Sequence, residues 1–419
     1  MTKTQKEINL LVKKTKEASK VLSIASTEVK NRALLRMARG LEKRARTLIR
    51  ENRKDLVSAS RKGKSKAFLD RLCLNERVVK GMAESLRTIA RLPDPVGEVS
   101  QMSRLPNGLA LGRMRVPLGV IAIIYESRPN VTSDTAGLCL KSGNAVILKG
   151  GSEALFSNSA IASILREGLE KVNLPPDGIS FVRQSGHEGV RYLLRHTEGI
   201  DLVIPRGGES LIREVTRISR IPVIKHDKGI CHVYVDSESD LNMAERIVMN
   251  AKVQRPSTCN AMEALLVNEE IAPRFLPPMI RKLQEKGVEI RGCERTQRLV
   301  KGVKRATVKD WRTEYLDLIL SVRIVKDLSE AISHITTYGS QHTDAIVTEN
   351  HENAMRFLQE VDSACVFVNA STRMSDGGVF GMGAEIGIST GKLHARGPMG
   401  LQELTSYKFV GFGSGQVRS

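Results

Sequence analysis

One cysteine stands in a setting suited to nucleophilic chemistry. Cys259 follows a Pro-Ser-Thr turn (residues 256–258), and the chain then runs into the apolar segment 264–267. A nearby cation or a helix N-terminus can stabilise the thiolate that acts as nucleophile. Arg255 lies just before the turn, and a short helix that begins near it would supply the second device. We interpret Cys259 as a candidate catalytic nucleophile; the alternative is a small core residue.

Two glycine turns offer sites for an anionic cofactor. In each, a basic residue and two glycines follow an apolar run, with Lys149, Gly150, Gly151 and Ser152 in the first turn and Arg206, Gly207 and Gly208 in the second. Glycines let the backbone approach a phosphate, and a following helix supplies N–H donors. Ser152 suits the N-cap of that helix. Ordinary turns with solvated basic side chains remain the alternative.

Two polar clusters follow apolar runs, at residues 125–132 and 369–373. Polar groups at strand ends are typical of sites carried on loops, although Asn, Ser and Pro are also ordinary turn residues. The glycines at 381–387 have the wrong spacing for a dinucleotide fingerprint and predict a loop.

The elements around these residues alternate between strands and helices. Apolar runs predict strands at 119–124, 145–148, 179–182, 201–204, 222–224, 232–235, 264–267, 288–291, 318–325, 345–347 and 365–368. Helical patterns lie between the early strands, at 133–141, 157–171, 189–196 and 209–218. This alternation is typical of βαβ units with a parallel sheet. Residues 5–92 predict amphipathic helices, and Asn107-Gly108 predicts a hairpin.

Composition describes a globular chain of 419 residues, with 41% hydrophobic and 26% charged residues. No apolar run approaches the roughly 20 residues needed to span a membrane, and the N-terminus has no signal-peptide core. We therefore expect a cytoplasmic location and no membrane partner. The six cysteines are scattered without a CxxC pair, which predicts neither a disulfide framework nor a metal site.

The net charge of +19 admits two interpretations. One is a nucleic-acid-binding protein, but the basic residues are spread along the chain and aromatic residues make up only 4%, which leaves few stacking platforms. The other is a basic solvated surface that attracts small phosphorylated anions. We favour the second and expect no nucleic-acid partner.

Several long motifs together resemble a known family. They are Pro117–Ile121, Tyr125–Val131, Leu148–Ser152, Gln254–Asn260, Val368–Arg373, Gly383–Thr390 and Leu393–Gly400. In this order, over nearly the whole chain, they resemble the gamma-glutamyl phosphate reductase family of the aldehyde dehydrogenase superfamily.

The resemblance implies an α/β fold with three parts. A Rossmann-like NADP-binding domain would comprise residues 1–97 and 117–228, with 373–403 returning to it. A smaller α/β catalytic domain would comprise residues 229–372. Residues 98–116 and 404–413 would form an oligomerisation arm.

The resemblance also implies a reaction, the second step of proline biosynthesis from glutamate. L-glutamyl 5-phosphate and NADPH would give L-glutamate 5-semialdehyde, phosphate and NADP+. Cys259 matches the family nucleophile and would form a thioester. The Cys259 backbone N–H and the Asn130 side chain would stabilise the oxyanion.

Binding residues follow from the same resemblance. Lys149 matches the lysine that holds the adenosine ribose. Ser152 stands where NAD-preferring relatives place a glutamate, which leaves room for a 2′-phosphate. Glu314 matches the residue that holds the nicotinamide ribose. For the substrate carboxylate and phosphate, bidentate binding by guanidinium groups is expected, and the candidates are Arg128, Arg255 and Arg373.

An aldehyde-oxidising dehydrogenase is the competing enzyme interpretation. Hydrolytic relatives activate water with a glutamate, whereas the matching position here is His226, which favours the reductase. We expect a homo-oligomer, either a dimer or a tetramer. A complex with glutamate 5-kinase would protect a labile acyl phosphate.

Overall fold

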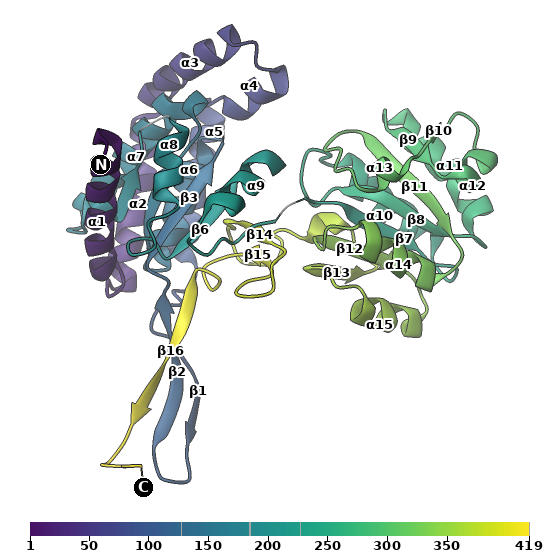
Figure 1. Cartoon of the computed structure of the whole chain (residues 1–419). Helices are drawn as coiled ribbons and strands as arrows, with labels where there is room; N and C mark the ends of the chain where they lie inside the picture. The colour runs from purple at the N-terminus through teal and green to yellow at the C-terminus, as the bar shows by residue number, and fades with distance from the viewer. Residues whose placement is uncertain (127, 184–185, 227, 419) are drawn as a thin grey trace. The chain divides into compact units, whose positions relative to one another are not determined.

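The computed structural model describes residues 1–126, 128–183, 186–226 and 228–418. The chain divides into two compact units. The first contains residues 1–225, 381–387 and 399–419, and the second contains residues 226–380 and 388–398. Each unit is described by itself below, with the element labels of Figure 1.

Five helices open the first unit, as predicted for residues 5–92. They are α1 (Lys3–Leu22), α2 (Thr27–Lys43), α3 (Ala45–Arg61), α4 (Lys66–Leu72) and α5 (Glu76–Arg91). Side-chain caps define several starts: Ser26 begins α2 and Asn75 begins α5 by accepting backbone N–H groups of the first turn. Their apolar faces are buried, which confirms the amphipathic pattern.

A four-stranded parallel sheet follows, with strand order β5-β4-β3-β6. Its strands are β3 (Val120–Tyr125), β4 (Ala145–Lys149), β5 (Ile179–Phe181) and β6 (Leu202–Arg206). The connecting helices are α6 (Asn130–Lys141), α7 (Leu155–Glu170), α8 (His187–Leu193) and α9 (Glu209–Ile218), with short 3-10 turns η1 (Ser152–Ala154) and η2 (Pro176–Gly178). The predicted βαβ alternation is confirmed. Strands β3 and β4 are buried along their whole length, as expected for parallel strands covered on both faces.

The strand predicted at 222–224 is wrong. Only an isolated bridge forms there, between Val203 and Val223. Pro222 has no N–H to donate, and the Ser219 hydroxyl donates to the Ile221 carbonyl at 2.7 Å in a tight turn just before it. The segment is therefore too short to extend the sheet.

The predicted hairpin belongs to a three-stranded antiparallel sheet of the first unit. Strands β1 (Val99–Arg104) and β2 (Ala110–Pro117) form the hairpin, and β16 (Thr405–Phe412) pairs with the other edge of β2. Gly108 in the turn has φ 88°, a conformation that favours glycine. In Figure 1 these three strands, here called the arm, extend away from the helices of their own unit.

The second unit is built on a seven-stranded parallel sheet with strand order β10-β9-β11-β8-β7-β12-β13. The strands are β7 (Cys231–Val235), β8 (Met262–Asn268), β9 (Glu289–Gly292), β10 (Lys304–Arg305), β11 (Ile319–Val325), β12 (Thr343–Val347) and β13 (Cys365–Val368). The helices are α10 (Leu241–Val253), α11 (Ala272–Glu285), α12 (Glu294–Leu299), α13 (Val308–Trp311), α14 (Leu328–Tyr338) and α15 (His351–Glu360), followed by the 3-10 turn η3 (Thr372–Met374).

Alternate residues of the central strands enter two separate cores of this unit. Leu265 and Val267 of β8 pack in one core, whereas Leu266 between them packs in the other. Both sheet faces are therefore covered, which explains why these strands read as continuous apolar runs.

The C-terminal part of the chain contributes segments to both units. Strands β14 (Gly387–Ser389) and β15 (Gly397–Met399) pair with each other, and residues 388–398 belong to the second unit. Residues 381–386 form a loop, as the glycine spacing predicted for 381–387, but Gly387 is wrong as a loop residue because it begins β14. Among the described residues, no helix combines the length and apolarity needed to cross a membrane.

Candidate active site

Cys259 lies in a turn between helix α10 and strand β8 of the second unit, and its side chain is partly exposed. The Thr258 hydroxyl donates to the Arg255 carbonyl at 2.9 Å. The Ala261 N–H donates to the Thr258 carbonyl at 3.0 Å. These bonds fix the backbone on both sides of the thiol.

The helix expected to begin near Arg255 is wrong. Helix α10 ends at Val253, with Gln254 as its C-cap, and β8 begins at Met262. Residues 254–261 between these two elements form successive turns. Within residues 254–261, all of which the structure describes, no helix begins that could stabilise the Cys259 thiolate.

Arg373 contacts this turn through two side chains that flank the cysteine. Its Nε donates to Gln254 Oε1 at 2.9 Å, and its Nη1 donates to Asn260 Oδ1. The Asn260 amide donates in turn to the Ser375 carbonyl at 2.9 Å. Burial, joined by the charge of Arg255, lowers the pKa of Arg373. The structure thus brings two of the three candidate arginines, Arg255 and Arg373, to the cysteine turn.

Gly229 lies directly against the backbone of the cysteine. A Cβ on Gly229 would sit 1.9 Å from the Cys259 carbonyl oxygen, so no other residue fits without a shift of the turn. The Gly229 N–H donates to Glu314 Oε1 at 2.9 Å. Glu314, predicted to contact a ribose, is therefore joined to the cysteine turn through one glycine.

A buried, uncharged layer supports the other side of the turn. The Cys231 thiol donates to the Cys259 carbonyl at 3.2 Å, and its Sγ lies 3.7 Å from His342 Nδ1. Burial, assisted by His226, lowers the pKa of His342 to about 3. Burial also raises the pKa of Cys231 well above its usual value. Cys231 is therefore a thiol at neutral pH, and the partly exposed Cys259 is the better nucleophile of the two.

The sequence interpretation missed a charged pair beside this turn. Lys252 Nζ lies 2.6 Å from Glu263 Oε2, and both side chains are buried. The one available signal was Glu263 itself, a charged residue next to a run of apolar ones. Spacing does not reveal that Lys252, on a different element, faces it.

The first glycine turn of the first unit places Lys149 at the carboxyl end of β4. Lys149 is buried, and its ammonium donates to the Gly150 carbonyl at 2.7 Å. Burial lowers the pKa of Lys149. A Cβ on Gly150 would meet Asn158 Nδ2 at 2.2 Å. The backbone here is close-packed, as a glycine turn requires.

Ser152 does not cap a helix, so that prediction is wrong. Ser152 is the first residue of the 3-10 turn η1, whose N-cap is Gly151, and the N-cap of α7 is Ala154. The Ser152 side chain is exposed and lies 3.4 Å from Glu153 Oε2. Glu153, which the sequence interpretation missed, brings a carboxylate to this turn and pairs with Lys64 at 3.6 Å.

The second glycine turn leads from β6 into α9. The Gly208 N–H donates to Glu126 Oε2 at 3.0 Å, and a Cβ on Gly207 would lie 2.7 Å from Glu126 Cδ. Arg206 packs against Gly387, whose Cβ would lie 2.5 Å from the guanidinium. The Glu126 carboxylate therefore already accepts from the Gly208 N–H, one of the donors that was expected to bind a cofactor phosphate.

Asn130 begins helix α6 in the first unit, and its amide donates to Asp134 Oδ2 at 3.1 Å. Burial raises the pKa of Asp134, although Asn130 and Arg206 oppose this rise. The side chain of Arg128 is exposed in the same segment. Ser127, which belongs to the motif Tyr125–Val131, lies outside the described residues.

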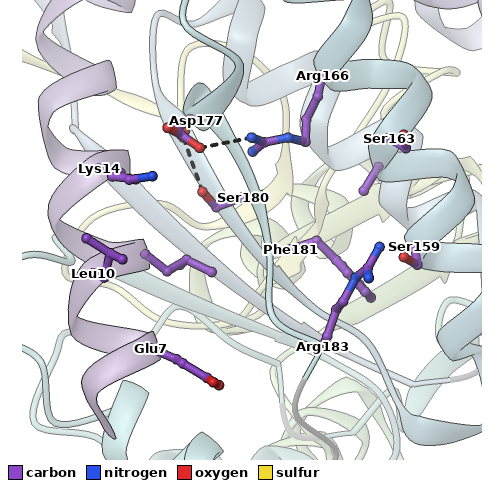
Figure 2. Close-up of a pocket in the computed structure, with 12 residues that line it drawn as sticks. Glu7, Leu10, Lys14, Ser159, Ser163, Arg166, Asp177, Ser180, Phe181 and Arg183 are labelled. Carbon is purple, nitrogen blue, oxygen red and sulfur yellow. Dashed lines mark hydrogen bonds and ion pairs between the residues drawn. The ribbon is translucent and has the colours of Figure 1, made fainter. Parts of the chain in front are cut away.

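A surface pocket of about 410 Å³ opens elsewhere in the first unit, between α1, α7 and β5. Figure 2 shows Lys14 and Arg183 on opposite sides of it, with Arg166 paired to Asp177 at 2.9 Å. The predicted site residues all lie in described ranges, and none of them lines this pocket.

Comparison with known proteins shows which family this chain resembles in sequence and fold. Residues 1–296 match the model of the aldehyde dehydrogenase family. A gamma-glutamyl phosphate reductase of Carboxydothermus hydrogenoformans is 56% identical over 98% of this chain and 99% of its own. The crystal structure of a gamma-glutamyl phosphate reductase from Thermotoga maritima has a TM-score of 0.97 at 47% identity, covering 99% of this chain and 100% of that one.

More distant structures share the fold alone. A glyceraldehyde-3-phosphate dehydrogenase of Methanocaldococcus jannaschii, complexed with NADP, has a TM-score of 0.68 at 14% identity, covering 98% of this chain and 95% of that one. The full-length relatives are decisive: this chain belongs to the aldehyde dehydrogenase family and, within it, to the gamma-glutamyl phosphate reductases.

Proposed function

We propose that this chain reduces L-glutamyl 5-phosphate to L-glutamate 5-semialdehyde and phosphate with NADPH, as the second step of proline biosynthesis. The observation that carries the proposal is the identity of 56% over 98% of the chain with a reductase of that name. The partly exposed Cys259 in a constrained turn supports it chemically.

The Cys259 thiolate attacks the acyl carbon and expels phosphate, which leaves a thioester. The nicotinamide, when bound, supplies a hydride for this thioester. The resulting thiohemiacetal oxyanion is stabilised by the Cys259 backbone N–H and the Asn130 amide. Collapse of the thiohemiacetal breaks the C–S bond, releases the aldehyde and restores the thiolate.

Three arginines bind the anionic ends of the substrate. Arg255 and Arg373 lie at the cysteine turn, which supports contacts with the leaving phosphate or the carboxylate. Their charges also favour the thiolate form of Cys259, a role that the missing helix would otherwise fill. Arg128 is the third candidate, on the first unit.

The cofactor is held by the two glycine turns and by Glu314. The buried Lys149 ammonium, of which one donor reaches Gly150, retains donors for ribose hydroxyls. Glycines in such a turn let the backbone approach a phosphate of the dinucleotide. The contributing residues are Lys149, Gly150, Gly151, Ser152, Arg206, Gly207, Gly208 and Glu314.

Preference for NADPH rests on Ser152, whose uncharged hydroxyl leaves room for a 2′-phosphate. Glu153 opposes that preference through its negative charge, and Lys64 offsets it at 3.6 Å. NADPH over NADH is therefore a modest preference in this proposal.

The arm joins copies of the chain into a dimer or tetramer. A cytoplasmic location and a complex with glutamate 5-kinase complete the proposal, since transfer between enzymes would protect the acyl phosphate from water.

The test is run in the reverse direction, with glutamate 5-semialdehyde and NADP+ in the presence or absence of phosphate. The wild type should require phosphate and favour NADP+ over NAD+, while Cys259→Ala should lose at least about 10³-fold in kcat. Cys73→Ala, another partly buried cysteine, should retain full activity as the control. Phosphate-independent oxidation would instead identify an aldehyde-oxidising enzyme, and an active Cys259→Ala would reject the thioester route.

A further inference from the structure

The buried pair Lys252–Glu263 lies beside the cysteine turn and touches the segment that carries Glu314. Lys252 is 0% and Glu263 is 1% exposed at the side chain, and their charged atoms are 2.6 Å apart. A buried ion pair adds little net stability over an apolar pair of the same shape. The pair is therefore better explained by the backbone conformation that it holds than by a gain in stability.

The second carboxylate oxygen of Glu263 holds a strained backbone. Glu263 Oε1 accepts the N–H of Leu316 at 3.0 Å, and Leu316 has φ 54°, in the left-handed region. A branched residue adopts this conformation only where the surroundings hold it. The hydrogen bond to Glu263 is such a restraint.

The restrained segment reaches the cysteine turn from its other end. Glu314, two residues before Leu316, accepts the Gly229 N–H at 2.9 Å, and Gly229 packs on the Cys259 carbonyl. Two carboxylates thus hold residues 314–316, one at each end. Burial raises the pKa of Glu263 to about 7, and the Lys252 charge opposes this rise and favours the carboxylate form.

We propose that Glu263, held by Lys252, is a positioning residue that sets the orientation of Glu314 toward the cofactor by anchoring Leu316. The inference rests on the proposed function, in which Glu314 contacts the nicotinamide ribose. A purely structural pair would affect folding stability and leave cofactor affinity unchanged. A positioning residue affects the Kd and KM for the cofactor more than the KM for the aldehyde.

Two double variants separate these roles. Lys252→Met with Glu263→Gln removes both charges and keeps an oxygen that accepts from Leu316. Lys252→Met with Glu263→Met also removes both charges but removes the acceptor. Both variants have lost the ion pair and differ in whether an oxygen accepts the Leu316 N–H, so a difference in NADPH affinity between them reports the anchor rather than the ion pair.

We expect the acceptor-free variant to bind NADPH about tenfold more weakly in a fluorescence titration, the effect of one lost hydrogen bond. Its KM for NADP+ should rise similarly and its KM for the aldehyde should stay within about twofold. The variant that keeps the acceptor should stay within about twofold of wild type in NADPH affinity. Glu263→Asp keeps the negative charge but moves the carboxylate oxygen away from the Leu316 N–H, so it should also weaken NADPH binding. This variant decides the question if the variant with Glu263→Met does not fold.

If the wild type is active, and both double variants and Glu263→Asp bind NADPH with wild-type affinity, the positioning role is overturned and the proposed function stands. A wild type that binds no dinucleotide would overturn the proposed function as well.

Discussion

Gly229 shows how a single residue limits the geometry of the cysteine turn. Its Cα lies so close to the Cys259 carbonyl that a Cβ would stand 1.9 Å from the oxygen, far inside van der Waals contact. Its N–H is also the donor to Glu314 at 2.9 Å. The absence of a side chain at one position therefore serves both the nucleophile and a proposed cofactor residue.

At this residue we predict that Gly229→Ala lowers kcat by at least about tenfold and destabilises the second unit by about 1–3 kcal/mol, the usual cost of overpacking. Steady-state kinetics and urea unfolding measure the two effects. Gly81→Ala is the matched control, because its Cβ meets nothing within 4 Å in helix α5, and it should be neutral or slightly stabilising. Wild-type activity in Gly229→Ala would show that the turn moves without consequence.

At the scale of elements, Asp310 ties helix α13 to strand β9 and to the segment that carries Glu314. Its carboxylate accepts from Arg291 Nη1 at 2.7 Å and from the Tyr315 hydroxyl at 2.9 Å. Thr307 donates to it in a capping box at the start of α13. Burial alone would raise the pKa of Asp310, but hydrogen bonds from Thr307 and Arg291 outweigh burial and hold it well below its usual value.

A depressed carboxyl pKa contributes stability above the pKa of the unfolded chain, about 4, and that contribution is lost as the pH falls below it. Asp310→Asn should therefore lower the free energy of unfolding of the second unit by about 1–3 kcal/mol at pH 7, with the difference from wild type shrinking below about pH 4. Fluorescence of Trp311, the single tryptophan of the chain, follows the unfolding.

The control for this prediction is Glu294→Gln. Its ion pair with Arg298 is about three-quarters exposed on both sides, so its removal should change stability by less than about 0.5 kcal/mol. A difference between Asp310→Asn and wild type that stays constant down to pH 3 would contradict the electrostatic explanation.

At the scale of the whole molecule, the arm has aromatic side chains that stay largely exposed within its own unit. Phe409 is 61% and Phe412 is 67% exposed on β16, and Arg113 stacks over Phe409 at 5.5 Å. All of β1 is exposed. A thin sheet without a buried face is marginal in water, which supports contact with a second copy.

We predict that Phe409→Asp combined with Phe412→Asp reduces the molar mass, measured by light scattering, to that of one chain, 46.2 kDa. A charge buried in an interface without a partner costs several kcal/mol, enough to dissociate it. Phe156→Asp, an exposed aromatic residue on α7, should leave the mass unchanged. The interface would be rejected if the wild type had a molar mass of 46.2 kDa, or if the double variant of the arm kept the wild-type molar mass.

The sequence by itself determined the features that depend on local pattern. Continuous apolar runs such as 119–124 and 264–267 predicted buried parallel strands, and Asn107-Gly108 predicted the hairpin, because periodicity and turn chemistry act over neighbouring residues. The long motifs around Cys259 and Lys149 also identified the family, which full-length relatives confirm. The roles of individual site residues remain predictions.

Only the tertiary structure decided which distant residues meet. The helix expected at Arg255 was wrong because the chain forms turns between α10 and β8, and the cap expected at Ser152 was wrong because Ser152 lies inside a 3-10 turn. Arg373 reaches Asn260, and Lys252 reaches Glu263, across elements that no local pattern relates. Packing sets those distances. It places Cys259 in a turn that Arg373 contacts through Gln254 and Asn260 and that rests on the buried, uncharged Cys231.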